Sequence, residues 1–104
     1  MTARTLQITP RFMGRIRDGT KRSTIRSGRR EFAPGDSLTF WDEDGGGLTV
    51  VVSQVIYKNV ADLTAGEAVI DGFGSLDELL GELVRIYPNL FPDSPVTVIG
   101  FTTN

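Results

Sequence analysis

The sequence predicts an α+β fold built on a small, mixed and curved β-sheet. Three observations carry this prediction. Two β-branched and aromatic runs, residues 37–42 and 48–57, flank a tight acidic turn, which favours an antiparallel hairpin over repeated strand–helix crossovers. Two helix-start motifs then precede a last apolar run at residues 95–101. With 104 residues, 39% of them hydrophobic, the chain can bury one modest core, and we expect a single domain over residues 1–104.

The first elements are a short strand and a helix. Residues 4–8 read as a strand, Thr9 as an N-cap, and Pro10 as the first helical residue. The helix presents an apolar face and ends at Gly19. That face consists of Phe12, Met13 and Ile16. We expect a loop after the helix, rich in basic residues and including a lysine and a threonine.

Two further helices are predicted by matching start signals. Thr64-x-x-Glu67 and Ser75-x-x-Glu78 both fit the capping box, in which side chains bind free backbone amides. The second helix is the longer and ends at Pro88. Its apolar residues recur at helical spacing: Leu76, Leu79, Leu80, Leu83, Val84 and Tyr87.

The charges are segregated along the chain, although the net charge is only −2. Residues 1–35 hold nine basic and two acidic residues, a sum of +7, whereas residues 36–104 hold two basic and 11 acidic residues, a sum of −9. If the basic segment gathers on one face, an anionic ligand is a natural partner. The alternative is that the two segments pair as surface ion pairs.

The absence of cysteine and histidine limits the possible chemistry. With Cys 0 and His 0, the chain has no disulfide, no Cys/His zinc site and no histidine acid–base catalysis. We therefore expect no metal and no cofactor. No run approaches the roughly 18 apolar residues of a membrane span, and residues 1–12 lack the apolar stretch of a signal peptide, so we expect a cytoplasmic protein without membrane partners.

Lys21 and Thr24 are the first candidates for chemistry, because the predicted loop could aim both into one cleft. A lysine beside a threonine hydroxyl can act as its general base if the lysine is neutral for part of the time. Neighbouring Arg22 and Arg26 and partial burial would lower the lysine pKa, whereas the preceding helix end would raise it. A solvated loop is the alternative to a catalytic one.

Four stretches together resemble the ASCH family, named for its homology to the activating signal cointegrator. They are "RFMGRIRDGTKRSTIRSG", "PGDSLTF", "LTAGEAVIDGFGSLDELLGELVRIYP" and "VTVIGF", and they follow the family's order through nearly the whole chain. The resemblance implies a PUA-like mixed β-barrel with flanking helices, a fold associated with RNA binding. It also implies a cleft at the K-x-x-T-x-R segment.

The resemblance extends to small bacterial amidohydrolases that release acetate from N4-acetylcytidine. In them the matched threonine is the nucleophile, the matched lysine activates it and a glutamate is the acid–base partner, which implies these roles for Thr24 and Lys21. Alignment puts Asp71 where the glutamate would stand. Aspartate is shorter by one methylene, and a displacement of about 1 Å can cost on the order of 10²-fold in rate. Glu67 is an alternative acid, although its capping role explains it more economically.

Other side chains are candidates for binding RNA or a modified nucleoside. Arginine suits phosphate through its planar fork of donors, and tryptophan can stack on a base. The candidates are Arg11, Arg22, Arg26 and Trp41. We interpret Arg29 and Arg30 as solvated loop charges, and Phe12, Phe73 and Tyr87 as core residues.

Two functions remain open at this point, and a third is weaker. The chain could hydrolyse an acylated cytidine, or it could be an RNA- or nucleotide-binding module without turnover. A ribonuclease is less favoured, because without histidine it would rely on lysine and carboxylate for proton transfer. The sequence leaves the oligomeric state open.

Overall fold

The structure, a computed structural model, describes residues 4–103 and contains five strands and three α-helices in that range. Apart from strand β2 and the turn η1, the order along the chain confirms the predicted one of strand, helix, hairpin, two helices and strand. The elements are β1 (Arg4–Gln7), α1 (Pro10–Arg17), β2 (Ser23–Ser27), β3 (Ser37–Trp41), β4 (Gly47–Asn59), the 3₁₀ turn η1 (Val60–Asp62), α2 (Ala65–Ile70), α3 (Leu76–Ile86) and β5 (Pro95–Thr102).

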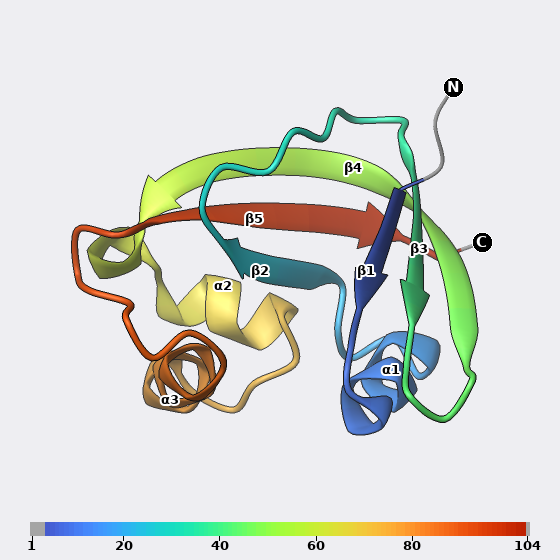
Figure 1. Cartoon of the computed structure of the whole chain (residues 1–104), viewed down its shortest axis with the longest axis horizontal. Helices are drawn as coiled ribbons and strands as arrows, with labels where there is room; N and C mark the ends of the chain where they lie inside the picture. Colours follow the sequence, from blue (N-terminus) through green and yellow to red (C-terminus); the bar gives the residue numbers. More distant parts are fainter. Residues whose placement is uncertain (1–3, 104) are drawn as a thin grey trace.

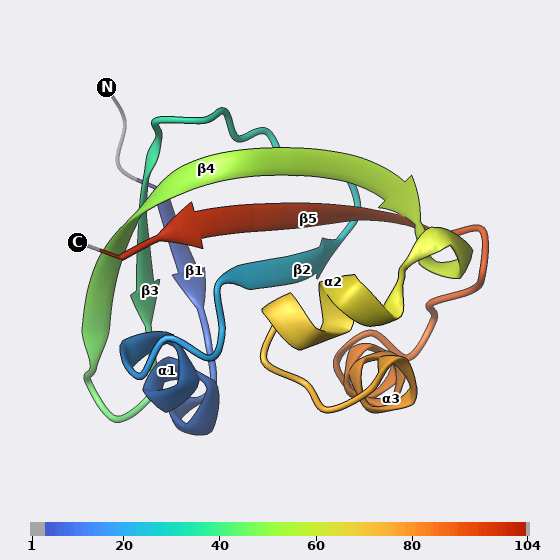
Figure 2. The same ribbon diagram turned by 180° about the vertical axis from the view of Figure 1, so that it is seen from behind.

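All five strands form one sheet in the order β1-β3-β4-β5-β2, with β1 and β3 parallel and the other pairs antiparallel. The 13-residue β4 joins the two halves, because its start pairs with β3 and its remainder with β5. A register shift between Val52 and Gln54 marks a bulge, which increases local twist and bends the strand. As a result β4 arches over the molecule and curls the sheet into a half-barrel (Figures 1 and 2). The predicted mixed, curved sheet of an α+β fold is confirmed.

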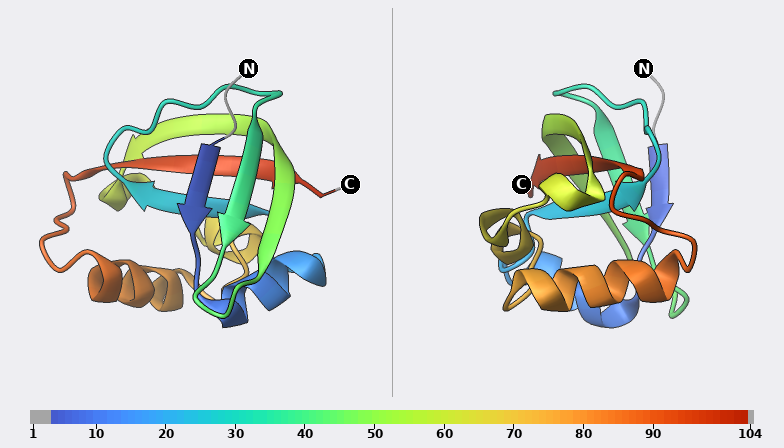
Figure 3. Two further views of the ribbon diagram at one scale, coloured as in Figure 1. Left: turned by 45° about the vertical axis from the view of Figure 1, so that its right-hand side comes forward. Right: turned by 90° about the vertical axis from the view of Figure 1, so that its left-hand side faces the viewer.

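The three helices lie on one side of the curled sheet, where they cover its open end (Figures 1 and 3). They bury apolar residues against the strands in a single core cluster. Leu38 and Phe40 of β3, Val50 of β4 and Ile99 of β5 are fully buried there. Two edges of the sheet, β1 and β2, pair with no further strand within residues 4–103, so the barrel stays open between them.

One element was predicted wrongly. Residues 23–27 form strand β2 instead of part of a loop, and they pair in register with β5 from Ser23↔Gly100 to Ser27↔Val96. The segment is short, and its arginine interrupts any apolar alternation, so the strand depends on its distant partner. Propensity alone gives little signal for a strand defined by such non-local pairing.

The predicted helix starts are confirmed, with differences in detail. Thr64 and Glu67 form the full capping box of α2, and the Ser75 side chain accepts a hydrogen bond from the Glu78 N–H at the start of α3. Thr9 is the N-cap of α1, but its side chain makes no capping hydrogen bond. Val84, which is among the apolar residues at helical spacing, is 52% exposed and does not join Leu79 and Leu83 in the core.

Candidate active site

A cleft of about 510 Å³ opens at the unpaired seam of the half-barrel. The segment after β1, the strand β2 and the helix α3 form its walls. Its polar lining combines the predicted catalytic residues with several others: Gln7, Thr9, Lys21, Thr24, Arg26, Glu43, Asp71, Glu82, Arg85 and Tyr87. Apolar lining comes from Phe12, Phe73 and neighbouring core residues.

A buried ion pair forms one end of this cleft. Lys21 Nζ lies 2.5 Å from Asp71 Oδ1 and 3.0 Å from the Asp71 carbonyl oxygen, and donates to both. Lys21 is only 4% exposed and Asp71 only 3%. The Ser23 hydroxyl lies 3.4 Å from the same carboxylate oxygen. The predicted lysine and acid are therefore in direct contact, although 50 residues separate them in the chain.

Backbone contacts bring Asp71 close to Lys21. Asp71 is the C-cap of α2, and the last helical carbonyl, of Ile70, accepts a hydrogen bond from the Arg22 N–H at 2.7 Å. Gly72 follows at φ 91°, where a Cβ would come within 3.1 Å of Lys21 Cβ. Only glycine adopts this conformation readily and permits such an approach. The close docking of the two backbones brings the Asp71 side chain into contact with Lys21.

Burial shifts the proton equilibria of the pair in opposite directions. Desolvation raises the pKa of Asp71 to about 6, against the opposing effect of Lys21. Desolvation also lowers the pKa of Lys21, and Asp71 opposes that shift. Both shifts favour the neutral amine and the protonated carboxyl. The pair can thus exchange one proton along a short hydrogen bond.

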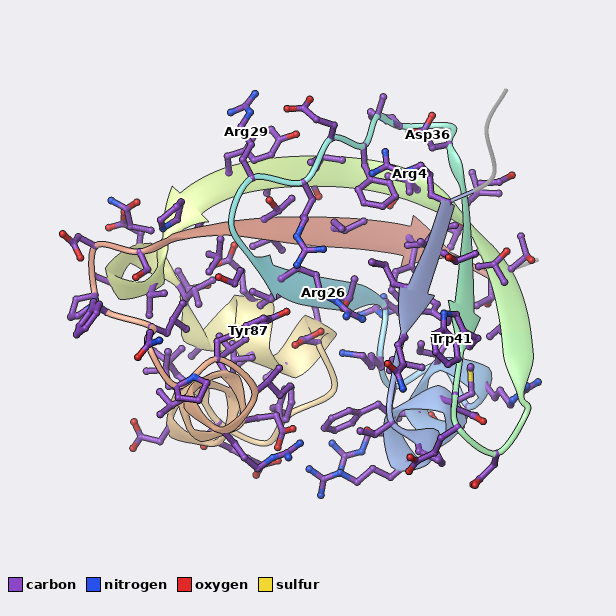
Figure 4. The ribbon with its side chains drawn as sticks, viewed as in Figure 1. Arg4, Arg26, Arg29, Asp36, Trp41 and Tyr87 are labelled. Atoms are coloured by element: carbon purple, nitrogen blue, oxygen red, sulfur yellow. The ribbon has the colours of Figure 1, made fainter. Side chains whose placement is uncertain are left out.

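Thr24 lies beside a half-buried guanidinium. Arg26 Nε donates a hydrogen bond of 2.9 Å to Thr24 Oγ1, which places both side chains on the same face of β2. Tyr87, at the end of α3, is also a hydrogen-bonding partner of Arg26 and points toward it (Figure 4). Burial lowers the pKa of Arg26 from its ordinary value. Such a guanidinium stabilises negative charge on the threonine oxygen.

Three of the predicted binding residues lie outside the cleft. Arg11 is exposed and pairs with Glu82 at 3.1 Å, so its charge is engaged by α3. Arg22 is exposed and contributes its backbone to the sheet and to α2. Trp41 is the last residue of β3, is 44% exposed and lies away from Arg26 (Figure 4). Among the predicted binding residues, the structure brings only Arg26 to the cleft.

Glu67 is not an alternative acid. Its carboxylate accepts from the Thr64 N–H at 3.0 Å and from Lys58 Nζ at 2.9 Å, and it does not line the cleft. The capping role suggested by the sequence explains this residue.

The sequence analysis missed several residues of the cleft. Phe12, Phe73 and Tyr87 belong to the core or pack against it, as predicted, but they also form cleft walls. The two phenylalanine rings meet edge to face, and Lys21 Nζ lies 5.4 Å from the Phe12 ring centre. Gln7 and Glu43 carry no motif, so only their position in the fold identifies them.

Residues 4–103 contain no group of three or more Asp or Glu side chains that could hold a metal ion. In the same range no helix has the length and apolar character needed to cross a bilayer.

Comparison with known proteins gives a structural likeness only. No family model and no curated protein sequence matches the chain. Among solved structures, the ASCH domain from Lactobacillus crispatus superposes with a TM-score of 0.81 at 14% identity, over 98% of this chain and 79% of that one. ASCH from Zymomonas mobilis gives 0.70 at 13% identity, over 94% and 65%, and a protein from Enterococcus faecalis gives 0.71 at 15%, over 89% and 69%.

Proposed function

We propose, from the ASCH-domain fold of this chain and the chemistry of its cleft, that the protein hydrolyses the amide of N4-acetylcytidine to cytidine and acetate. One observation carries the proposal. A lysine, a threonine and an acid that are matched to the amidohydrolases by sequence alone meet at one cleft, and the lysine and the acid form a buried pair. A structural ion pair would not require a reactive hydroxyl at the same cleft.

The reaction begins with the neutral form of the pair, in which Asp71 holds the proton; at neutral pH this form is a minority, because the pKa of Asp71 is about 6. Thr24 Oγ attacks the acetyl carbonyl carbon and gives its proton to Lys21 Nζ. Arg26, next to Thr24 Oγ1, stabilises the negative charge that develops on the acetyl carbonyl oxygen during this attack. The C–N bond then breaks, Asp71 protonates the leaving N4, and Lys21 returns its proton to Asp71. Water hydrolyses the acetyl ester on Thr24, which releases acetate and restores the hydroxyl.

The test is a chromatographic assay of N4-acetylcytidine with wild-type protein and matched Thr24 variants. Thr24→Val keeps the shape of the side chain but removes the nucleophile, so turnover should fall at least about 10³-fold. Thr24→Ser keeps a hydroxyl and should retain measurable turnover. Lys21→Ala should abolish turnover, with circular dichroism as a check on folding. Equal turnover by wild type and Thr24→Val would refute the mechanism, and no turnover by wild type would refute the function.

A second candidate is a binding module that holds RNA or a modified nucleotide without turnover. One observation favours this candidate. Lys21 Nζ donates two hydrogen bonds, both to Asp71, and none to Thr24. In that state the lysine is a structural cation instead of a base. Binding of cytidine by a protein that releases no acetate would support this candidate.

A further inference from the structure

Strand β2 has an open edge that faces the cleft. The Phe101 N–H donates to the Arg22 carbonyl at 3.1 Å, and the Gly28 N–H donates to the Pro95 carbonyl at 2.8 Å. Because antiparallel strands alternate, Thr24 and Arg26, which lie between these two hydrogen bonds, turn their main-chain groups toward β5. The odd-numbered residues turn theirs to the opposite edge. The Ser27 carbonyl does so, since it accepts a hydrogen bond from Arg30 Nε at 3.0 Å.

The orientation of the odd-numbered main-chain groups matters most at Ile25. This residue is 5% exposed and lines the cleft. The register turns its N–H and C=O away from β5, β2 has no other strand neighbour, and no other hydrogen bond to either group is found within residues 4–103. Nearly all buried main-chain groups in native proteins are paired with protein or water. A donor and an acceptor on one residue, side by side and unpaired at a cleft wall, are suited to a ligand that offers the complementary pair.

We infer that the main chain of Ile25 reads the pairing edge of the cytosine ring, its N–H donating to N3 and its C=O accepting from the N4–H. This inference rests on the proposed function for its substrate, N4-acetylcytidine. The ring nitrogen N3 is an acceptor, and the adjacent acetylated N4 keeps one hydrogen to donate. Recognition by an exposed strand edge uses main-chain groups and needs no particular side chain, so no sequence motif indicates it.

The positions of the neighbouring residues fit this mode of binding. Thr24 and Arg26 flank Ile25 in β2 and share one face of the strand. A ring held at Ile25 through N4 therefore has its acetyl group next to the proposed nucleophile and its guanidinium partner. Gln7, the last residue of the other edge strand, β1, also lines the cleft.

Binding of the reaction product tests the inference without depending on catalysis. Cytidine and 3-deazacytidine, which carries C–H in place of N3, are titrated into wild-type protein while the Ile25 amide is followed by ¹⁵N NMR. Cytidine should shift the Ile25 amide resonance and bind on the order of 10- to 100-fold more tightly than 3-deazacytidine, the range expected when a buried donor loses its acceptor. 5-Methylcytidine keeps both groups and is the matched control, with affinity close to that of cytidine.

Two variants of Ile25 separate the main chain from the side chain. Ile25→Val trims the side chain and should keep the preference for cytidine. Ile25→Pro removes the N–H, at an open strand edge where proline is tolerated, and should bind the two nucleosides equally. If Ile25→Pro fails to fold, the wild-type comparison still decides the question.

The outcomes distinguish this inference from the proposed function. Acetate release by wild type together with equal binding of cytidine and 3-deazacytidine overturns the inference and leaves the proposed function in place. A preference for cytidine without acetate release supports the inference and rejects the amidohydrolase. Failure to bind either nucleoside overturns the inference.

Discussion

At the scale of single residues, the most informative feature is the buried ion pair of Lys21 and Asp71. Two ionisable groups, each less than 5% exposed, are held 2.5 Å apart in a cleft. Buried pairs of this kind add little stability, because desolvation offsets the attraction. Their opposite pKa shifts are instead what an acid–base pair needs near neutral pH. The removal of one partner, however, leaves the other buried and uncompensated.

Lys21→Met should therefore destabilise the protein by about 3–5 kcal/mol at neutral pH, because the Asp71 carboxylate loses its cation. Without Lys21 the pKa of Asp71 should rise further, so the deficit relative to wild type should narrow as the pH falls toward about 6 and the buried carboxyl of the variant becomes neutral. Urea denaturation at several pH values measures both effects. The double variant Lys21→Met/Asp71→Asn, which has neither charge, is the control and should recover stability at neutral pH. A deficit independent of pH would contradict the assignment.

The raised pKa of Asp71 determines how the stability of the folded protein changes with pH. Its pKa in the folded protein, about 6, lies above the ordinary value of 3.8, so the folded state holds the proton more tightly. The resulting stabilisation is fully present below pH 3.8 and is lost as the pH rises through about 6. Between these values wild type should lose stability relative to Asp71→Asn, as measured by denaturation at each pH. Parallel pH profiles for the two proteins would be inconsistent with a raised pKa.

At the scale of elements, the cleft depends on β2 and α3, which are far apart in the sequence. β2 supplies Thr24, Ile25 and Arg26 from an edge strand, and α3 supplies the facing wall with Leu79, Leu83 and Tyr87. The helix is placed by two buried leucines and by its N-cap at Ser75. Its stability can be changed without altering any residue that lines the cleft.

Ser75→Ala should lower the free energy of unfolding by about 1 kcal/mol, because the Glu78 N–H loses its acceptor. Thermal or urea denaturation measures the loss. Ser75→Asp preserves an acceptor at the N-cap and should restore most of the stability. If Ser75→Ala were as stable as wild type, the cap would not contribute.

Gly81→Ala should change the same helix in the opposite direction. Gly81 lies within α3 and is exposed, and apart from the adjoining residues and the backbone of its own helix no atom lies within 4 Å of where a Cβ would stand. The substitution should stabilise the protein by about 0.5–1 kcal/mol, since glycine has the higher conformational entropy in the unfolded chain. The same denaturation experiment measures it, and acetate release by the variant should be unchanged. A loss of stability would show that this turn of α3 is not a regular helix.

At the scale of the whole molecule, the opposite charges of the two chain segments meet in the fold. Arg11 pairs with Glu82 and Lys21 with Asp71, each joining the basic N-terminal segment to the acidic remainder. Arg29 pairs with Glu31 inside the basic segment. Part of the basic segment is therefore engaged in ion pairs, as the alternative interpretation of the sequence expected. Fewer cations remain to bind the phosphate backbone of a nucleic acid.

The salt dependence of the reaction follows from this distribution. N4-acetylcytidine is neutral, so kcat/KM should change little between about 50 and 500 mM NaCl, where screening weakens exposed charge interactions. Phosphate contacts would instead give a log–log decrease with a slope of about −0.7 for each contact with single-stranded RNA. A steep decrease would indicate that the true ligand is a nucleic acid. Arg22→Ala and Arg30→Ala would then be expected to reduce the slope.

The local sequence determines the helix starts, the β3–β4 hairpin and the general class of fold. Capping side chains, apolar periodicity and turn residues act within a few positions of one another, so Thr64, Ser75 and the acidic turn could be read directly. The sequence also provided Lys21, Thr24 and Asp71 as candidates, through their resemblance to a known pattern.

Only the tertiary structure decided how these candidates meet. The contact of Lys21 with Asp71 depends on the docking of α2 against the start of β2, and strand β2 itself depends on β5, more than 60 residues away. The open main chain of Ile25 follows from that strand's register, and the fold also leaves Trp41 and Arg22 outside the cleft. Such contacts are set by the packing of the whole chain, because the free energy that orders them comes from burying one shared core and not from local propensity.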